Sequence, residues 1–454
     1  MKQKLLSQKL NFLKMNSLKL TSSRTIILSF LGLILFGTLL LMLPFATRSG
    51  QSASFLDALF TATSASCVTG LIVQDTATYW SPFGQTVILM LIQVGGLGVV
   101  TMALAISLAG GRRIGLRARS FMQDTVSAPN VGGVLKLTGF ILKGTAIFEL
   151  AGAVSFSFVF IPKFGVIKGI WYSLFHSISA FCNAGFDLMG INLKYSSLTA
   201  YADHPLIVTT VSALVIIGGI GFLVWQDIRE NGLKVKRYRM QSKVVLTFSA
   251  ALLVVPTLLF LFLEFREGSF GHRLSLSWFQ SMTARTAGFN TADLTTLSEA
   301  GAMVMIILML IGGSPGSTAG GMKTTTFAVL LANMRSVFLR RDDSSYFGRR
   351  INRESVRSAA TILTLYSVLF IGGGCLISRI EHIPLLTCLF ETASAVGTVG
   401  VTMGITPGLG TISRLILIFL MFLGRVGGLT IIFAAVSPGK NRLSKYPLEN
   451  ITVG

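Results

Sequence analysis

The chain has 454 residues, of which 52% are hydrophobic and only 13% are charged, and its mean hydropathy is +0.70. Soluble globular proteins carry about 25% charged residues. This composition excludes a soluble multidomain protein and predicts a polytopic membrane protein. The four cysteines are far apart and none belongs to a CxxC pair, which argues against a disulfide framework and a zinc site.

The formal net charge of +21 could indicate nucleic-acid binding, so the positions of the basic residues decide its meaning. Of the 39 Lys and Arg residues, 26 fall in five segments: 1–24, 112–119, 229–243, 335–357 and 440–445. Each segment borders a long apolar run, as the cytoplasmic loops of membrane proteins do. The pattern favours loops that attract anionic membrane lipid, and no nucleic acid is expected as a partner.

Taken in chain order, eight apolar runs approach or exceed the roughly 20 residues that span a bilayer. They are 25–46, 84–110, 137–161, 205–226, 243–263, 300–339, 358–378 and 412–436. Between the members of each pair lies a piece too short to cross, at about 53–66, 168–180, 274–284 and 384–395. If these pieces are re-entrant helices, all five basic segments fall on one side. We therefore predict eight spans in the cell membrane, with both termini cytoplasmic.

The four short pieces repeat one pattern. They read FTATSASCVTGL, FHSISAFCNAGF, FQSMTARTAGF and FETASAVGTVGV. Each begins with Phe, has Ser or Thr four residues later (Ser64, Ser179, Thr283, Ser394), and reaches a glycine nine or ten residues after the Phe. A second motif, VGG or IGG, recurs at 94–96, 217–219, 311–313 and 426–428.

These repeats predict an all-α polytopic membrane protein of four covalently linked span, re-entrant helix and span units, with pseudo-fourfold symmetry around one central pore. The expected units are a basic N-terminus at 1–24, repeat 1 at 25–110, repeat 2 at 132–228, repeat 3 at 242–340, repeat 4 at 354–436 and a C-terminal tail at 437–454.

Four glycine-bearing strands on one axis indicate a cation path. Non-helical backbone is tolerated at membrane depth only where it is buried in protein or lines water. Glycine lets carbonyl oxygens turn inward, and rings of carbonyls replace the hydration shell of a cation. Close helix packing is the simpler explanation for the glycine pairs of the long spans. It does not explain four short helices that are each followed by glycine.

At these residues the chain resembles the membrane subunit of Ktr potassium-uptake systems, in the Trk/Ktr/HKT superfamily, over residues 25–436. The stretches CVTGL, NAGFD, TAGFN and GTVGV match its four selectivity-filter segments. The implied filter residues are Val68, Thr69, Gly70, Asn183, Ala184, Gly185, Thr286, Ala287, Gly288, Thr398, Val399 and Gly400. Glycine at all four last positions is similar to potassium-selective members, and only Thr398-Val399-Gly400 approaches the TVG signature of potassium channels.

The resemblance also implies the ions and partners. Potassium would bind at Gly70, Gly185, Gly288 and Gly400, sodium is a second candidate ion, and no organic cofactor is expected in this chain. The implied partners are a second copy in a homodimer and a cytosolic ring of RCK-type nucleotide-binding subunits, docked on the basic loops and the C-terminal tail.

Residues 312–322, GGSPGSTAGGM, interrupt the sixth span, because five glycines and a proline cannot continue a helix. The segment imitates a Walker A loop, but Met322 is misplaced and the membrane context argues against phosphate binding. A packing kink is the structural alternative. The resemblance implies a gate loop formed by Gly312, Gly313, Ser314, Pro315, Gly316, Ser317, Thr318, Ala319, Gly320, Gly321 and Met322.

Arg425 lies inside the eighth span, where an arginine costs about 2.5–3.5 kcal/mol unless it faces protein or water. The VGG alignment places Gln93, Ile216 and Leu310 at equivalent positions. The resemblance implies a pore-facing cation that lowers cation occupancy below the filter or secures the gate loop through its carbonyls. A structural salt bridge is the alternative.

Four further charged residues lie near the predicted spans and short helices. We expect Lys143 and Glu149 to pair, Glu391 to pack or hydrogen-bond, and Arg285 to secure the third filter strand. No paired carboxylates, Ser/His/Asp set or His/Cys cluster indicates an enzyme. A sodium- or proton-coupled secondary transporter with a midplane site is the alternative function, although such proteins usually show twofold repeats and intramembrane acids.

Overall fold

The computed structural model describes residues 22–99, 101–102, 134–191, 193–435 and 449. Four long helices among these residues are apolar enough to cross a bilayer. They are α2 (Ser22–Leu41), α7 (Val134–Phe164), α11 (Met240–Leu263) and α15 (Arg353–Glu381). Their exposed faces carry large apolar side chains such as Leu39, Phe158, Phe262 and Val368, as expected of surfaces in contact with lipid.

A short helix follows each long one, at the places that the sequence indicates. These helices are α3 (Phe55–Ser66), α8 (Val166–Phe181), α12 (Phe270–Thr283) and α16 (Leu385–Gly397). The phenylalanines that begin the repeated motif, Phe60, Phe175, Phe279 and Phe390, are all fully buried. Each therefore anchors its short helix in the protein interior rather than in lipid.

The second helix of every repeat is broken. These helices are α4 (Pro82–Leu97), α9 (Pro205–Gly219), α13 (Glu299–Leu310) and α17 (Thr411–Val426). Three of the breaks fall at or next to a glycine with strongly positive φ: Gly98 (88°), Gly221 (95°) and Gly427 (90°). L-residues rarely adopt this conformation, so the glycine turns the chain. The third repeat breaks at the 312–322 loop.

The predicted spans at 84–110, 205–226 and 412–436 are therefore not continuous helices in the part of the chain that the structure describes. After Gly221 and Gly427 the chain continues in α10 (Phe222–Asn231) and α18 (Gly428–Ala435), and α9 and α10 meet at 93°. Residues 103–110 lie outside the described part of the chain. With each bent pair counted as one span, up to five spans of the described residues meet criteria of length and composition.

The broken helices also correct the register of the repeats. A Cβ at Gly95, Gly218 or Gly424 would collide with the carbonyl oxygen of Ser66, Phe181 or Val396, respectively. These three carbonyls occupy equivalent places, each four residues before a predicted filter glycine. Arg425 therefore corresponds to Gly96 and Gly219, and its predicted equivalence with Gln93 is wrong. The repeated element is a glycine pair three residues apart, not the VGG tripeptide.

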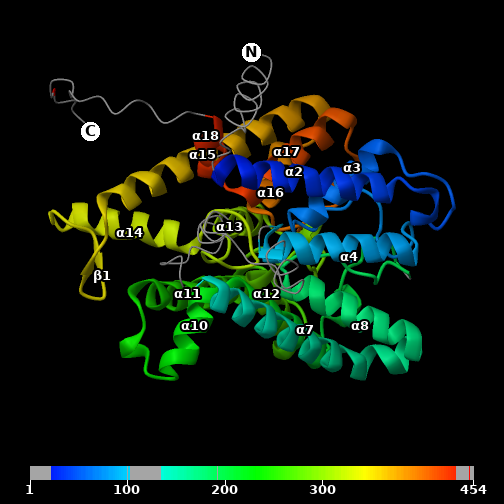
Figure 1. Ribbon diagram of the computed structural model, residues 1–454, viewed down its shortest axis with the longest axis horizontal. Coiled ribbons are helices and arrows are strands. Elements are labelled where there is room, and N and C mark those ends of the chain that lie inside the picture. The colour runs from blue at the N-terminus through cyan, green and yellow to red at the C-terminus, as the bar shows by residue number, and fades with distance from the viewer. Residues whose placement is uncertain (1–21, 100, 103–133, 192, 436–448, 450–454) are drawn as a thin grey trace, which may run out of the picture.

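The repeats pack around a common centre. Within the first repeat α2 packs on α3 and α4, and in the second α7 packs on α8 and α9. Figure 1 shows α2, α15 and α17 on one side of the molecule, and α7, α8 and α12 on the other. Short 3-10 turns in the described connections are η1 (Pro44–Ala46), η3 (Thr199–Tyr201), η4 (Val235–Arg237), η5 (Leu294–Thr296) and η6 (Thr406–Gly408).

One small sheet departs from the all-α expectation. After α14 (Thr324–Phe338), strands β1 (Ser345–Tyr346) and β2 (Arg349–Arg350) form an antiparallel hairpin. The Tyr346 hydroxyl donates to the Ala328 carbonyl at 3.0 Å and ties the hairpin to α14. The described part of the chain is thus mostly helical, with one hairpin in a basic segment.

We expect Gly95→Ala to lower the stability of the fold, because its new methyl group would meet the backbone of Ser66. Overpacking of this kind costs about 1–3 kcal/mol. The matched control is Gly32→Ala in α2, where a Cβ meets no atom within 4 Å. Thermal unfolding of both variants in detergent measures the effect, and equal melting temperatures would contradict the assigned contact.

Candidate functional site

Four loops meet where the short helices end, and their glycines touch in chain order. A Cβ built on Gly70 would lie 2.5 Å from the Ala184 carbonyl oxygen, and one on Gly185 would lie 2.5 Å from the Gly288 Cα. A Cβ on Gly288 would lie 2.7 Å from the carbonyl oxygen of Val399. Gly400 closes the circle, because its Cβ would collide with the carbonyl oxygen of Thr69.

The backbone of these loops has one unusual conformation, repeated four times. The residue two positions before each glycine has positive φ: Val68 (56°), Asn183 (58°), Thr286 (70°) and Thr398 (52°). The glycines share it, at 95°, 68°, 82° and 92°, whereas the intervening residues do not. Positive φ is rare for β-branched residues. Alternating handedness turns successive N–H groups to one face and carbonyl groups to the other.

The hydroxyl groups of the repeated motif hold these loops in place. Ser64 and Ser394 accept hydrogen bonds from the N–H groups of Gly70 and Gly400, at 3.1 and 3.0 Å. The corresponding hydroxyl groups in the second and third repeats instead donate to the carbonyl group of the residue after the glycine. Ser179 bonds Phe186 at 2.7 Å and Thr283 bonds Phe289 at 2.5 Å. The sequence displayed this Ser/Thr pattern, but its purpose becomes visible only in the structure.

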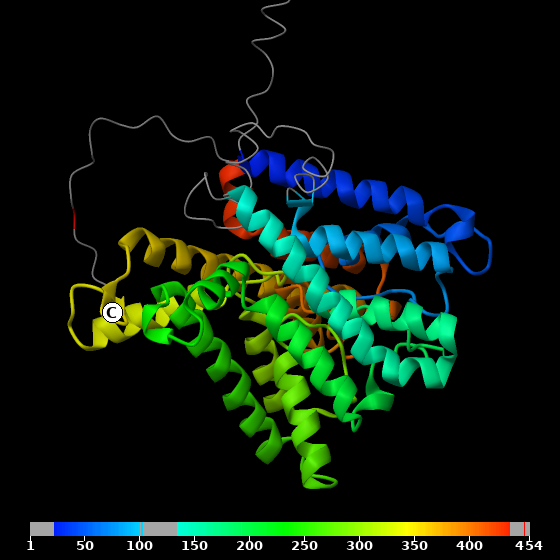
Figure 2. The same ribbon diagram turned by 60° about the horizontal axis from the view of Figure 1, so that its bottom comes forward.

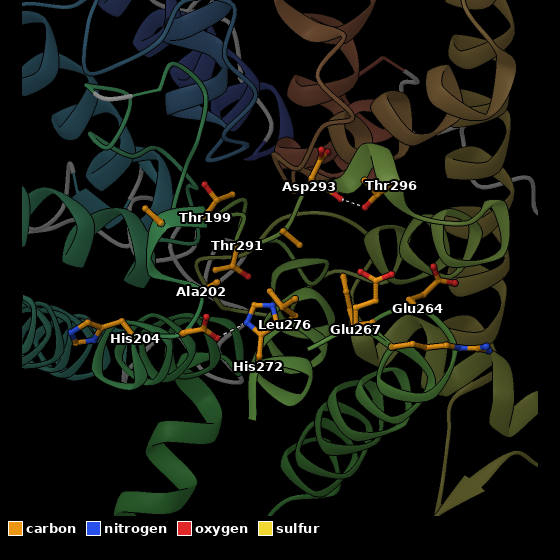
Figure 3. A pocket seen from close by; sticks show the side chains of 15 residues that line it. Thr199, Ala202, His204, Glu264, Glu267, His272, Leu276, Thr291, Asp293 and Thr296 are labelled. Atoms are coloured by element: carbon orange, nitrogen blue, oxygen red, sulfur yellow. Dashed lines mark hydrogen bonds and ion pairs between the residues drawn. The ribbon is translucent and has the colours of Figure 1, made fainter. Parts of the chain in front are cut away.

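A cavity of about 550 Å³ opens beside the ring and is lined by all four glycines. A wider cavity of about 970 Å³ adjoins it and shares Thr199, Thr291, Ala292 and Asp293 (Figure 3). Its wall includes His272, whose Nδ1 lies 2.5 Å from an Asp203 carboxylate oxygen. The wider cavity contains none of the four glycines, so the narrower one is the candidate site.

The 312–322 loop packs against the other end of the ring. The Thr318 hydroxyl donates to the Phe181 carbonyl at 3.1 Å and lies 3.3 Å from the Asn183 side-chain oxygen. A Cβ on Gly321 would lie 2.7 Å from the Gly397 carbonyl oxygen, and one on Gly320 would collide with the Thr398 hydroxyl. The loop therefore contacts the second and fourth repeats at the residues that directly precede their ring glycines.

Arg425 ties this loop to α4. Its guanidinium donates to the carbonyl oxygens of Thr318 and Gly95, and to that of Gly96 at 2.8 Å. Arg425 forms no ion pair with any residue that the structure describes, so the described residues give no support to the salt-bridge alternative. Its described partners are backbone carbonyl groups, whose dipoles compensate its charge.

Lys323 is a second cation that contacts the loop, and its role was not predicted from the sequence. It immediately precedes α14, and its Nζ turns back to the carbonyl oxygens of Ala319 (2.8 Å) and Gly320 (3.3 Å). A cation is unfavourable at a helix N-terminus, so these carbonyls are needed there. The available signal was a lysine directly after a glycine run inside an apolar span.

Three other expectations can be compared with the structure. Glu149 accepts a hydrogen bond from Gln93 at 3.3 Å, whereas Lys143 is exposed and not in an ion pair with it, so that predicted pair is wrong. Glu391 is a hydrogen-bonding residue, as expected, and accepts from Thr402 and from Thr406 at 2.6 Å. Arg285 contacts Ser249 on α11 at 3.4 Å, which links the loop that carries Gly288 to a long helix.

The apolar outer helices and the central backbone ring define a multi-pass helical membrane protein. The chain belongs to the TrkH family, described as cation transport protein, whose family model matches residues 4–445. The resemblance found in the sequence is therefore confirmed.

Individual relatives extend over nearly the whole chain. The potassium/sodium uptake protein NtpJ of Enterococcus hirae is 42% identical over 433 residues, which cover 93% of this chain and 95% of that protein. Ktr system potassium uptake protein B of Bacillus subtilis is 38% identical, with coverage of 96% and 97%. The crystal structure of the potassium transporter TrkH from Vibrio parahaemolyticus has the same fold, with a TM-score of 0.71 at 19% identity, and covers 93% of this chain and 86% of that one.

We expect Ser394→Ala to destabilise the ring, because the buried Gly400 N–H loses its acceptor. An unsatisfied buried donor costs about 1–3 kcal/mol. Ser157→Ala is the control, because that hydroxyl lies at the surface and bonds only a carbonyl of its own helix. Thermal unfolding should separate the two variants, and a loss no larger than that of the control would show that the hydroxyl does not support the loop.

Proposed function

We propose that the protein takes up potassium across the cell membrane, and that the ion passes through the ring of Gly70, Gly185, Gly288 and Gly400. The observation that carries this proposal is the closed contact of four backbone loops between long apolar helices. The names of the relatives support potassium as the ion, and that of NtpJ adds sodium as a second candidate.

The ring supplies the chemistry that an ion needs at membrane depth. An isolated ion in a medium of low dielectric costs tens of kcal/mol. Carbonyl oxygens of the twelve filter residues would replace its water, since each loop has the same alternating backbone. Each short helix ends at its loop and directs its partially negative C-terminus there.

The 312–322 loop is the proposed gate beneath the filter. Its contacts with Asn183, Gly397 and Thr398 support an obstruction at that place. Arg425 and Lys323 hold it by its carbonyl oxygens. Opening would require these bonds to break, and a chain of small residues offers little steric resistance to that motion.

The cytoplasmic side would face a regulatory partner. The basic segments 229–243 and 335–357 lie at the same end of the molecule, near α10, α14 and β1 (Figures 1 and 2). Their common position supports cytoplasmic loops. An RCK-type nucleotide-binding ring would dock there on a homodimer, with both termini cytoplasmic and the four repeats bounded as the sequence predicts.

Ion flux tests the function directly. Expression in a strain without its own potassium uptake should restore growth at low potassium, and rubidium or potassium influx should rise. Replacement of sodium and dissipation of the proton gradient then separate a channel-like path from a coupled secondary transporter. Absence of uptake in well-folded protein supplied with its regulatory ring would overturn the proposal.

We expect Gly70→Ser to raise the permeation of sodium relative to potassium. The new Cβ would stand 2.5 Å from the Ala184 carbonyl oxygen, in a residue whose φ of 95° disfavours side chains. Gly404→Ser is the control, because Gly404 lines the same cavity with φ of 85° but has open space around it. Competition of sodium with potassium influx measures the ratio, and unchanged selectivity in folded Gly70→Ser would refute the filter assignment.

We expect Arg425→Gln to raise cation flux in the absence of the regulatory ring. The change removes a charge and weakens the bonds to Thr318 and Gly95. A unit charge about 8 Å from a passing ion, at an effective dielectric constant near 20, changes its energy by about 2 kcal/mol. Arg266→Gln serves as control, because Arg266 is exposed and donates to the Phe262 carbonyl of α11, away from the loop. Equal flux in both variants and wild type would argue for a packing role.

A further inference from the structure

The position two residues after each ring glycine has a common location but a different side chain in every repeat. These residues are Ile72, Asp187, Asn290 and Thr402, and all four line the cavity of about 550 Å³ beside the ring. The backbone of the ring has nearly fourfold symmetry, whereas the layer formed by these four side chains has none. Only one member of the layer, Asp187, bears a charge.

Three of the four side chains offer little to an ion. Ile72 has no polar side-chain atom. The Asn290 side-chain oxygen accepts from Gln280 at 3.0 Å and from the Ala292 N–H at 3.1 Å. The Thr402 hydroxyl donates to Glu391 and accepts from the Gly404 N–H at 2.9 Å. Asn290 and Thr402 thus hold their own loops together.

Asp187 is different. One of its carboxylate oxygens accepts from the Met189 N–H at 2.9 Å. The other has no hydrogen-bond partner among the described residues, and no described lysine or arginine forms an ion pair with it. Half of the carboxylate is therefore free at the wall of the cavity that the four glycines share.

The charged and titratable groups around Asp187 do not neutralise it. Asp75, from the first repeat, acts on it as a like charge and accepts the Tyr195 N–H at 3.1 Å. His176 of α8 accepts the Leu188 N–H through its Nε2 at 3.3 Å. Lys194 and Asp293 line the same cavity with opposite charges. An unpaired carboxylate at this place needs a counter-ion from the solution.

We propose that Asp187 forms an outer cation site, where a partly hydrated monovalent cation binds before it enters the glycine ring. This inference rests on the proposed function, because it places the site at the mouth of that path. Carboxylate and water oxygens suit hard cations. A single carboxylate attracts the ion yet binds it weakly enough for onward movement, as conduction requires.

The site should respond to pH near neutrality. Burial raises the pKa of Asp187 to about 7, and the neighbouring Asp75 acts in the same direction while the Met189 N–H opposes them. The carboxylate is charged above that pH and attracts cations, whereas below it the group is protonated and the attraction is lost. A bound cation favours the charged form and therefore lowers this pKa.

The experiment compares potassium influx of wild type, Asp187→Asn and Asp293→Asn between pH 6 and pH 8. For wild type, we expect KM to rise as the pH falls. Asp187→Asn should raise KM at pH 8 by about five- to tenfold, the effect of one nearby charge in a largely aqueous site, and should make KM independent of pH. Its maximal rate should change little. Asp293→Asn, on the same cavity, should keep the wild-type profile.

Further variants keep the result interpretable. If Asp187→Asn folds poorly, Asp187→Glu retains the carboxylate and should retain the pH dependence. Wild-type KM and pH profile in folded Asp187→Asn would overturn the outer site. If Gly70→Ser still alters selectivity in that case, the path through the ring stands and only this inference fails. If neither variant changes transport, the proposed path itself is wrong.

Discussion

The structure depends on one constraint: four stretches of non-helical backbone must meet in the middle of an apolar protein. Such backbone is stable there only if its polar groups are bonded or face water. The motif hydroxyls satisfy some of these groups, as Ser64 does for Gly70 and Ser394 for Gly400. The buried phenylalanines fix the short helices that deliver the loops. Small residues of the broken helices then pack directly on these loops. Gly95, for example, leaves no room for a Cβ beside the Ser66 carbonyl.

The same constraint explains why the second helix breaks in every repeat. A helix that passes against a loop at van der Waals distance must present glycine, and a glycine three residues later turns the chain away. In the third repeat this break is enlarged into the 312–322 loop. In the fourth, Arg425 stands where the first two repeats have Gly96 and Gly219. One substitution within the repeat thus places a cation where its guanidinium can bridge the enlarged loop and α4.

Much of this arrangement could be predicted from the sequence, because the same motif recurs in all four repeats. The short helices, their phenylalanines and the four glycines recur at nearly constant spacing. The break at 312–322 could be predicted from its glycines and proline, but those at Gly98, Gly221 and Gly427 could not, since one glycine in an apolar run is equally compatible with close packing. The VGG alignment was wrong because the fourth repeat has two apolar–glycine pairs three residues apart, Leu423-Gly424 and Val426-Gly427. The first pair, not the VGG tripeptide, is the one that packs on the short-helix loop. The Lys143–Glu149 pair failed because spacing on one helix does not reveal that Gln93, from another repeat, reaches Glu149 first.

At the centre of the protein the backbone of the four loops is symmetric, whereas the side chains around it are not. Coordination of one ion on an axis needs equivalent oxygens, and four loops with the same sign pattern of φ can supply them whatever their side chains are. Residues that break the symmetry lie on both sides of the ring: Asp187 lines the cavity, and Lys323 and Arg425 bond the 312–322 loop. The proposed recruitment and closure of the path depend on these asymmetric residues. A chain made of four linked repeats can change each of these positions separately. Four identical subunits could not, because every substitution would appear four times around the axis.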